Sequence, residues 1–274
     1  MGDAAANGLE KGAIAKMVNA IVELEDFWAD DSRRLYDRTH DVFNQPSNAC
    51  LGLEDLGRDT LLFQRFDAIR SNNYHTMAEL MGRRIVASVT TYPKRIGNIR
   101  PMLDSILAQS RRPDALVIQL FADEFPHGLD DLPKDVRELV DQGKVSIRFC
   151  EENLRPHLKY FYAIQDNPDS LVITVDDDIV YQRDLFERLW WSYLQFPKAV
   201  SAVRAHLITF SENGDFLPYN SWLKEIEIAP CKPSMQLFAT GVGGVAYPPG
   251  TLPDETFDVE DILSTTVMND DLWL

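Results

Sequence analysis

LVITVDDDIVY, at residues 171–181, joins a run of apolar residues directly to three consecutive aspartates. The apolar run predicts a buried strand, and Asp176, Asp177 and Asp178 follow at its carboxyl end. Three adjacent carboxylates repel one another, and each loses hydration at the edge of a core. A divalent cation would compensate this charge, and such oxygen ligands suit Mg²⁺ or Mn²⁺ held together with substrate phosphates. The alternative is a solvated acidic turn that caps a helix beginning near residue 182.

Short strands and helices alternate on both sides of this stretch. From residue 83 onward, the hydrophobic pattern predicts strands at 85–89, 115–121, 145–150, 171–175 and 199–208, with helices at 99–107, 132–141, 158–165 and 185–196 between them. This alternation indicates an α/β domain with a mostly parallel sheet that is covered on both faces. Ligands bind beyond the carboxyl ends of the strands in such sheets, and the turn at 90–93 and the three aspartates both lie at such ends.

The first 82 residues have a different hydrophobic pattern. Apolar residues recur there at helical spacing, namely Ile14, Met17, Val18, Ile21 and Leu24, and again between 61 and 69. We therefore predict two parts, a helical N-terminal extension at 1–82 and an α/β domain at 83–274. The helices of the extension offer a surface through which an oligomer can form.

The composition limits which partners the protein can bind and in which cellular compartment we expect it. The 274-residue chain carries a formal net charge of −16, which argues against nucleic acid or an anionic membrane surface as a partner, because both need clustered Lys and Arg. No apolar run is long enough to span a bilayer, and the N-terminus lacks the pattern of a signal peptide. Cys50, Cys150 and Cys231 are far apart in the sequence and fit reduced thiols. We therefore expect a cytoplasmic protein without a transmembrane segment.

The aspartates belong to an ordered series of motifs. The series reads SVTTYPKRI at 88–96, SILAQS at 105–110, LKYFYAI at 158–164, VDDDIVY at 175–181, PYNSW at 218–222, TGVGGVAYPP at 240–249 and NDDLWL at 269–274. In this order the motifs resemble glycosyltransferases of the GT-A fold, in particular the family 2-like bacterial branch associated with capsule and lipopolysaccharide glycans. The resemblance implies a Rossmann-like nucleotide-diphospho-sugar transferase fold with a mixed, mostly parallel sheet. It also implies transfer of a sugar from a nucleotide diphosphate sugar to a hydroxyl of a glycan or glycolipid, with inversion.

The resemblance implies donor-binding roles for residues of the first four motifs. One set would surround the nucleotide base and ribose: Thr90, Thr91, Tyr92 and Pro93. Arg95 would flank the phosphates, and Lys159 would offset the diphosphate charge, although an exposed loop arginine and a surface lysine are the structural alternatives. Asp176 matches the acidic position near the ribose and beside the metal, Asp178 matches the metal ligand, and Asp177 shares either task.

The later motifs match the acceptor side. Trp222 would stack on an acceptor ring, and Gly243 and Gly244 would let the backbone approach a sugar closely, whereas a buried tryptophan and a structural turn are the alternatives. The resemblance places the general base in the acidic pair before the Trp-Leu dipeptide, with Asp271 as first choice and Asp270 as second. The same pair also suits a helix N-terminus. Members of the family continue past this pair, so the resemblance implies a domain shortened at its C-terminus.

Two other classes of function fit the sequence. Asp176-x-Asp178-x-Val180 after an apolar strand matches the nucleophile motif of haloacid-dehalogenase-like phosphatases, in which Asp176 would attack phosphorus and Asp178 would act as acid and base. That motif normally opens its domain, however, and here it lies past the middle of the chain. The other class is a non-catalytic module that binds a sugar or nucleotide. Donor binding without turnover would distinguish such a module from a transferase.

Overall fold

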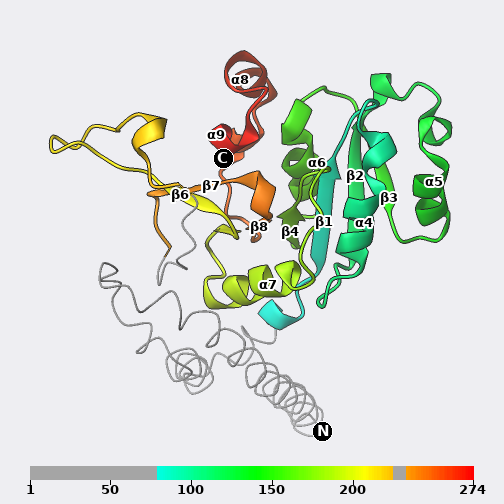
Figure 1. Cartoon of the computed structure of the whole chain (residues 1–274), viewed down its shortest axis with the longest axis horizontal. Coiled ribbons are helices and arrows are strands. Elements are labelled where there is room, and N and C mark those ends of the chain that lie inside the picture. Colours follow the sequence, from blue (N-terminus) through cyan, green and yellow to red (C-terminus); the bar gives the residue numbers. More distant parts are fainter. Residues whose placement is uncertain (1–78, 225–232) are drawn as a thin grey trace, which may run out of the picture. The chain divides into compact units, whose positions relative to one another are not determined.

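A six-stranded sheet forms the centre of the domain (Figure 1). The computed structural model describes residues 79–224 and 233–274, so most of the extension predicted at 1–82 lies outside the described residues. The strands in spatial order are β3 (Ser146–Cys150), β2 (Ala115–Phe121), β1 (Ile85–Thr90), β4 (Leu171–Thr174), β8 (Val245–Tyr247) and β5 (Ser201–Ala202). The first four run parallel, whereas β8 is antiparallel to both of its neighbours. The predicted α/β class with a mostly parallel sheet is confirmed.

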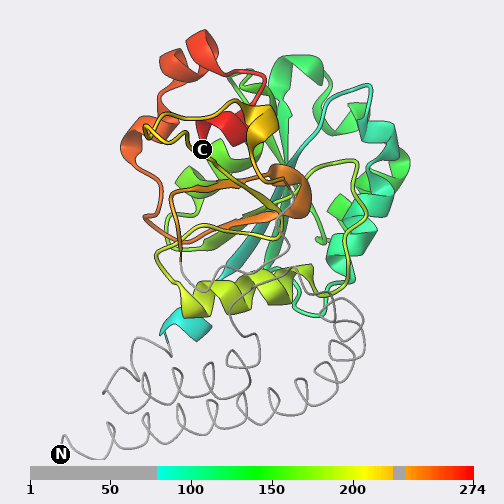
Figure 2. The ribbon, with the colours of Figure 1, turned by 60° about the vertical axis from the view of Figure 1, so that its left-hand side comes forward.

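Four helices lie close to where the sequence predicts them: α4 (Arg100–Leu107), α5 (Lys134–Asp141), α6 (Leu158–Asp166) and α7 (Leu185–Gln195). Two further helices, α8 (Val259–Thr265) and α9 (Asp270–Trp273), were not predicted. Helix α6 packs on β1, β2 and β4, and α7 contacts β5 and β8. Figures 1 and 2 show α8 and α9, in red, at the end of the domain opposite α7. None of the helices in the described ranges is long and apolar enough to cross a membrane.

The single strand predicted at 199–208 is wrong. This stretch contributes β5 to the main sheet and β6 (Ala205–Leu207) to a separate two-stranded sheet, where β6 pairs with β7 (Leu237–Ala239). The N–H of Val203 donates to the carbonyl of Gly244 at 3.3 Å and continues the pairing of β5 with β8, whereas the carbonyl of Arg204 accepts from the N–H of Thr240 at 3.1 Å beside the pairing of β6 with β7. The turn Gly241–Gly243 interrupts the partner segment between these two bonds and so divides the stretch. The apolar pattern cannot reveal this division, because it depends on a distant segment.

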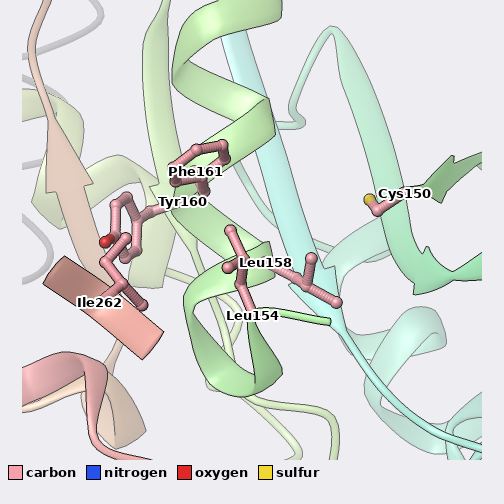
Figure 3. Close-up of a cluster of buried hydrophobic side chains, with 6 residues drawn as sticks. All are labelled: Cys150, Leu154, Leu158, Tyr160, Phe161 and Ile262. Carbon is pink, nitrogen blue, oxygen red and sulfur yellow. The ribbon is translucent and has the colours of Figure 1, made fainter. Parts of the chain in front are cut away.

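The C-terminal helices are fixed to α6 by a buried apolar cluster (Figure 3). Its buried members are Cys150, Leu154, Leu158, Tyr160, Phe161 and Ile262. Ile262 comes from α8 and is fully buried, and Figure 3 shows it beside the ring of Tyr160. Full burial of such a side chain stabilises the fold by about 1.5–3 kcal/mol. The cluster therefore holds the last part of the described chain against the helix that follows β3.

Polar contacts add to this attachment. Trp273 donates from Nε1 to the carbonyl of Thr256 at 2.9 Å, which ties α9 to the segment before α8. His157 is fully buried, and burial lowers its pKa, so its imidazole is neutral near pH 7. A neutral ring that donates from Nε2 to the carbonyl of Thr266 (2.9 Å) leaves Nδ1 to accept from the Tyr160 hydroxyl (3.0 Å). The bond to Thr266 fixes the short segment between α8 and α9 to the residue before α6.

Candidate functional site

The candidate site lies where the order of the sheet changes direction. From β1 the chain moves outward through β2 and β3 and then returns to β4 on the other side of β1. Such a switch point leaves a crevice beyond the carboxyl ends of the two central strands. The parallel register, which pairs Ser88 with Thr174, brings the residues that follow β1 and β4 together. Accordingly, the Thr91 hydroxyl donates to Oδ2 of Asp177 at 2.6 Å.

Arg95 neutralises part of the aspartate run. Its Nη2 lies 2.9 Å from Oδ1 of Asp177, and the same nitrogen also pairs with Asp178. Burial raises the pKa of Asp177, whereas the Thr91 hydrogen bond and the Arg95 charge oppose this shift. The side chain of Asp178 is 57% exposed and that of Arg95 is 37% exposed. This ion pair is therefore accessible to solvent.

The motif at 105–110 holds the loop that follows the aspartates. Ser105 accepts a hydrogen bond from the N–H of Tyr181 at 3.1 Å, and Gln109 donates to the carbonyl of Gln182 at 2.7 Å. The Tyr181 hydroxyl in turn accepts from the backbone N–H of Asp176 at 2.8 Å. The sequence gives no role to Ser105 or Gln109, because their partners at 181–182 are more than 70 residues away. These contacts fix the direction in which the aspartates leave β4.

Lys159 is the central cation of the site. It comes from the first turn of α6 and is only 5% exposed, so the alternative of a surface lysine is excluded. Its Nζ lies 2.8 Å from Oδ1 of Asp176 and 2.9 Å from Oδ2 of Asp270. Burial lowers the pKa of Lys159, but the charges of Asp270 and Asp176 outweigh burial and raise it above the usual value. The ammonium group therefore stays charged.

Asp271, near the end of the described chain, lies close to Lys159 and Asp176, beside Gly241. The backbone N–H of Gly241 donates to Oδ1 of Asp271 at 2.8 Å. A Cβ atom on Gly241 would lie 2.9 Å from Nζ of Lys159, 3.1 Å from Oδ1 of Asp271 and 3.6 Å from Oδ1 of Asp176. Burial raises the pKa of Asp271, and repulsion from Asp270 adds to the rise. Only glycine lets the chain at position 241 pass this close to the charged groups.

Negative charge is in excess among these groups. Two cationic side chains pair with four of the five clustered aspartates: Lys159 with Asp176 and Asp270, and Arg95 with Asp177 and Asp178. The fifth, Asp271, accepts from the Gly241 N–H. Within 79–224 and 233–274 no three or more His, Cys, Asp or Glu side chains are grouped so as to hold a metal ion by themselves. The donor set fits a different mode, in which one or two carboxylates share a hard cation with substrate phosphates. The exposed Asp178 is suited to this role.

The residues predicted to surround the base and ribose follow β1, at the same edge of the sheet as the aspartates that follow β4, but they differ in their contacts. Thr91 is buried and bonded to Asp177, whereas Tyr92 and Pro93 are exposed. Thr90 donates its hydroxyl to the carbonyl of Gln119 on β2 at 2.9 Å. The structure therefore brings Thr91 into the site and gives Thr90 a contact within the sheet.

The residues predicted for the acceptor side have structural contacts of their own. Trp222 is half-buried, donates to the carbonyl of Leu217 at 2.9 Å and packs edge-on against Phe238 of β7. Gly244 has φ +85° and lies against Leu185. A Cβ on Gly243 would come within 2.9 Å of the Arg204 side chain. Each of these residues is thus explained by local packing, and their contact with an acceptor stays a prediction.

Sequence reasoning missed the pairing that organises the site. Lys159 was assigned to the donor phosphates, and the Asp270–Asp271 pair to catalysis, without a link between them. The position of Gly241 between Lys159 and Asp271 was also missed. The only signal was the apolar surroundings of Lys159 on its helix, because nothing in the sequence shows which distant acid a buried lysine meets.

Comparison with known proteins finds likeness in structure but not in sequence. No protein-family model matches the chain, and no curated protein matches it. Among solved structures, the chain is similar to the 4-diphosphocytidyl-2C-methyl-D-erythritol synthase of Anaerococcus prevotii. The identity is 13%, the TM-score is 0.43, and the match covers 72% of this chain and 83% of the other. A likeness of this size does not bear on the activity of this chain.

Proposed function

We propose that residues 83–274 act as a glycosyltransferase that depends on a divalent cation. The enzyme would move a sugar from a nucleotide diphosphate sugar to a hydroxyl of a glycan or glycolipid, with inversion. One observation carries the proposal. At the switch point of a parallel sheet, the aspartates after β4 and the C-terminal pair Asp270–Asp271 meet around the buried Lys159. Ligands of α/β sheets bind at such a point, and the motif resemblance implies the same reaction.

The donor diphosphate would lie over the exposed part of the cluster. Asp178 and Asp176 would hold Mg²⁺ or Mn²⁺, which supplies charge neutralisation for the departing diphosphate. Arg95 pairs with Asp177 and Asp178 when no donor is bound, so binding of the cation would release its guanidinium group toward the phosphates. Thr91 keeps Asp177 in place through the hydroxyl contact.

Asp271 is our candidate for the general base. Its carboxylate would take the proton of the acceptor hydroxyl while the acceptor oxygen bonds to the sugar carbon and the bond from that carbon to the diphosphate oxygen breaks. The Gly241 N–H holds Oδ1, which leaves Oδ2 for the proton. Burial and Asp270 raise the pKa of Asp271, which brings it closer to the range in which a base works efficiently.

Titration of nucleoside diphosphates tests the donor site. UDP, GDP and CDP are titrated by calorimetry into the full chain, with and without MnCl₂, and into Asp178→Asn. We expect one of them to bind only with Mn²⁺, and Asp178→Asn to lose that binding. The control is Asp141→Asn, which removes an exposed aspartate at the end of α5. Metal-independent binding that Asp178→Asn leaves intact would contradict the proposed donor site.

A second experiment tests the reaction. Asp271→Asn should retain the nucleotide affinity and lose about 10²–10⁴-fold in transfer rate, because a positioned base contributes that much. Hydrolysis of an aryl phosphate through a phosphoaspartate at Asp176 would instead identify a phosphatase. Donor binding without transfer to any acceptor would identify a binding module.

A further inference from the structure

The Lys159 ammonium group is buried and held by two carboxylates. An ammonium group has three N–H donors. Asp176 and Asp270 accept from it at 2.8 Å and 2.9 Å. Gly241 lies so close that a Cβ there would be 2.9 Å from Nζ. Only 5% of the residue is exposed, so little of Lys159 is open to a diphosphate.

We infer that Lys159 is a positioning residue, whose ammonium group ties the C-terminal acidic pair to the aspartates after β4 and so sets the place of Asp271. This inference rests on the proposed function for its catalytic meaning. It differs from the role that the motif resemblance implies, which is contact with the donor diphosphate. A phosphate ligand needs an accessible cation, whereas a positioning residue needs a buried one with fixed partners.

Helix α9 depends on contacts such as the ion pair between Lys159 and Asp270, because it is too short to be stable alone. It spans Asp270–Trp273, a single turn, and isolated helices of this length do not persist in water. Asn269 caps the turn by accepting from the Leu272 N–H at 3.1 Å. Its position in the domain comes from side-chain contacts at either end, Asp270 with Lys159 and Trp273 with the Thr256 carbonyl. Without Lys159, the end that carries the acidic pair loses its charged partner.

The carboxylate of Asp271 is aligned as a consequence. Asp270 and Asp271 are adjacent in the same turn, so the contact at Asp270 fixes the backbone from which Asp271 projects. The Gly241 N–H then selects the direction of the Asp271 side chain. A displacement of about 1 Å at a reacting group can cost about 10²-fold in rate. Lys159 would therefore act on catalysis through Asp270 and Asp271 while touching neither substrate.

The first measurement needs no activity. Amide hydrogen exchange of residues 266–274 is compared in the parent chain, in Lys159→Met and in the control Lys134→Met. Lys134 also lies in the first turn of a helix, and its side chain is 86% exposed, so the control removes the same charge from a comparable place in the secondary structure without breaking a buried contact. We expect exchange in this segment to rise about tenfold or more in Lys159→Met only, because the tie that protects α9 is lost. Unchanged exchange would overturn the inference.

The second measurement separates positioning from donor contact. With MnCl₂, Lys159→Met should bind UDP or GDP no more weakly than the parent, because the lost cation touches no phosphate, while kcat falls about 10²-fold. A tenfold or greater loss of nucleotide affinity with unchanged exchange would assign Lys159 to the donor. If the parent binds no nucleotide, the proposed function fails, and the exchange experiment still decides whether Lys159 positions α9.

A second variant at the same ion pair, Asp270→Asn, covers the case in which Lys159→Met does not fold. Asp270→Asn keeps the shape of the side chain and leaves the pair between Lys159 and Asp176 in place. It should raise exchange in 266–274 and lower kcat in the same direction as Lys159→Met. Where both variants fold, the double variant should cost no more than the larger single effect, because both changes break one tie. Strictly additive losses of kcat would contradict the inference.

Discussion

Gly241→Ala is a sensitive probe of the candidate site. The added methyl group would lie 2.9 Å from Nζ of Lys159 and 3.1 Å from Oδ1 of Asp271. Carbon atoms in contact normally stay about 3.5–4.0 Å apart, and contacts to nitrogen and oxygen are only slightly shorter. Lys159 cannot simply swing away, because Asp176 and Asp270 both hold it. The substitution must therefore move at least one charged group of the site.

The expected cost follows from two opposing effects. Overpacking a tight site costs about 1–3 kcal/mol. The backbone at Gly241 has no positive φ, so alanine brings the usual gain of about 0.4–1 kcal/mol from a less flexible unfolded chain. The difference between these two ranges predicts a loss of about 0–2.6 kcal/mol, centred a little above 1 kcal/mol, in the free energy of unfolding. Displacement of Asp271 by about 1 Å would lower the proposed transfer rate by about 10²-fold.

Urea denaturation and transfer kinetics measure the two effects. Gly97→Ala serves as the control for stability, because a Cβ on Gly97 meets no atom within 4 Å and its φ is not positive. We expect Gly97→Ala to be neutral or slightly stabilising and Gly241→Ala to be destabilising. A Gly241→Ala variant with the stability and the turnover of the parent would refute the close packing of Gly241, Lys159 and Asp271.

Three further predictions concern the core and its titratable groups. Ile262→Ala should lower the free energy of unfolding by about 2–5 kcal/mol in urea melts, because Ile262 is fully buried between α8 and α6, and a loss below about 0.5 kcal/mol would contradict this packing. Burial lowers the pKa of His157, so its contribution to stability should be complete above its unfolded pKa of about 6.5 and be lost as the pH falls through the folded value. Urea midpoints between pH 8 and pH 5 should show this decline in the parent and less of it in His157→Gln. Burial also raises the pKa of the Cys150 thiol to about 11, so a variant with Cys50→Ser and Cys231→Ser should react with a disulfide reagent at pH 8 only after denaturation.

Local pattern was enough to predict the central strands. The run before Asp176 is apolar and β-branched, and the four parallel strands of the sheet all lie within a residue or two of their predicted positions. Strand β8 was not predicted, because Val245–Tyr247 is only three residues long and lies between glycines and prolines. Such a segment has no periodicity to read, and its place in the sheet comes from pairing with β4 and β5.

The contacts of the candidate site also fall into two groups, those that the sequence could predict and those that it could not. The contact between Thr91 and Asp177 follows from the rule that adjacent parallel strands end at one edge, so the sequence could predict that these residues meet. The pair between Lys159 and Asp270 could not be predicted, since it joins the first turn of α6 to a helix near the end of the chain. No local pattern in either segment predicts the contact between Lys159 and Asp270. The contact depends on the apolar cluster that packs α8 against α6.

The two cations of the site differ in how readily they can exchange partners. The pair of Arg95 with Asp178 is exposed, and exposed ion pairs contribute only about 0–1 kcal/mol, so a divalent cation or a phosphate can displace it at little cost. The pair of Lys159 with Asp270 is buried, and removing one partner of such a pair costs about 3–5 kcal/mol. Under the proposed function, the donor would therefore rearrange charges on the Arg95 side, while the Lys159 side keeps the C-terminal acids in place through the reaction. A structure with bound nucleotide in which Lys159 leaves Asp270 and Arg95 keeps Asp178 would reverse this assignment.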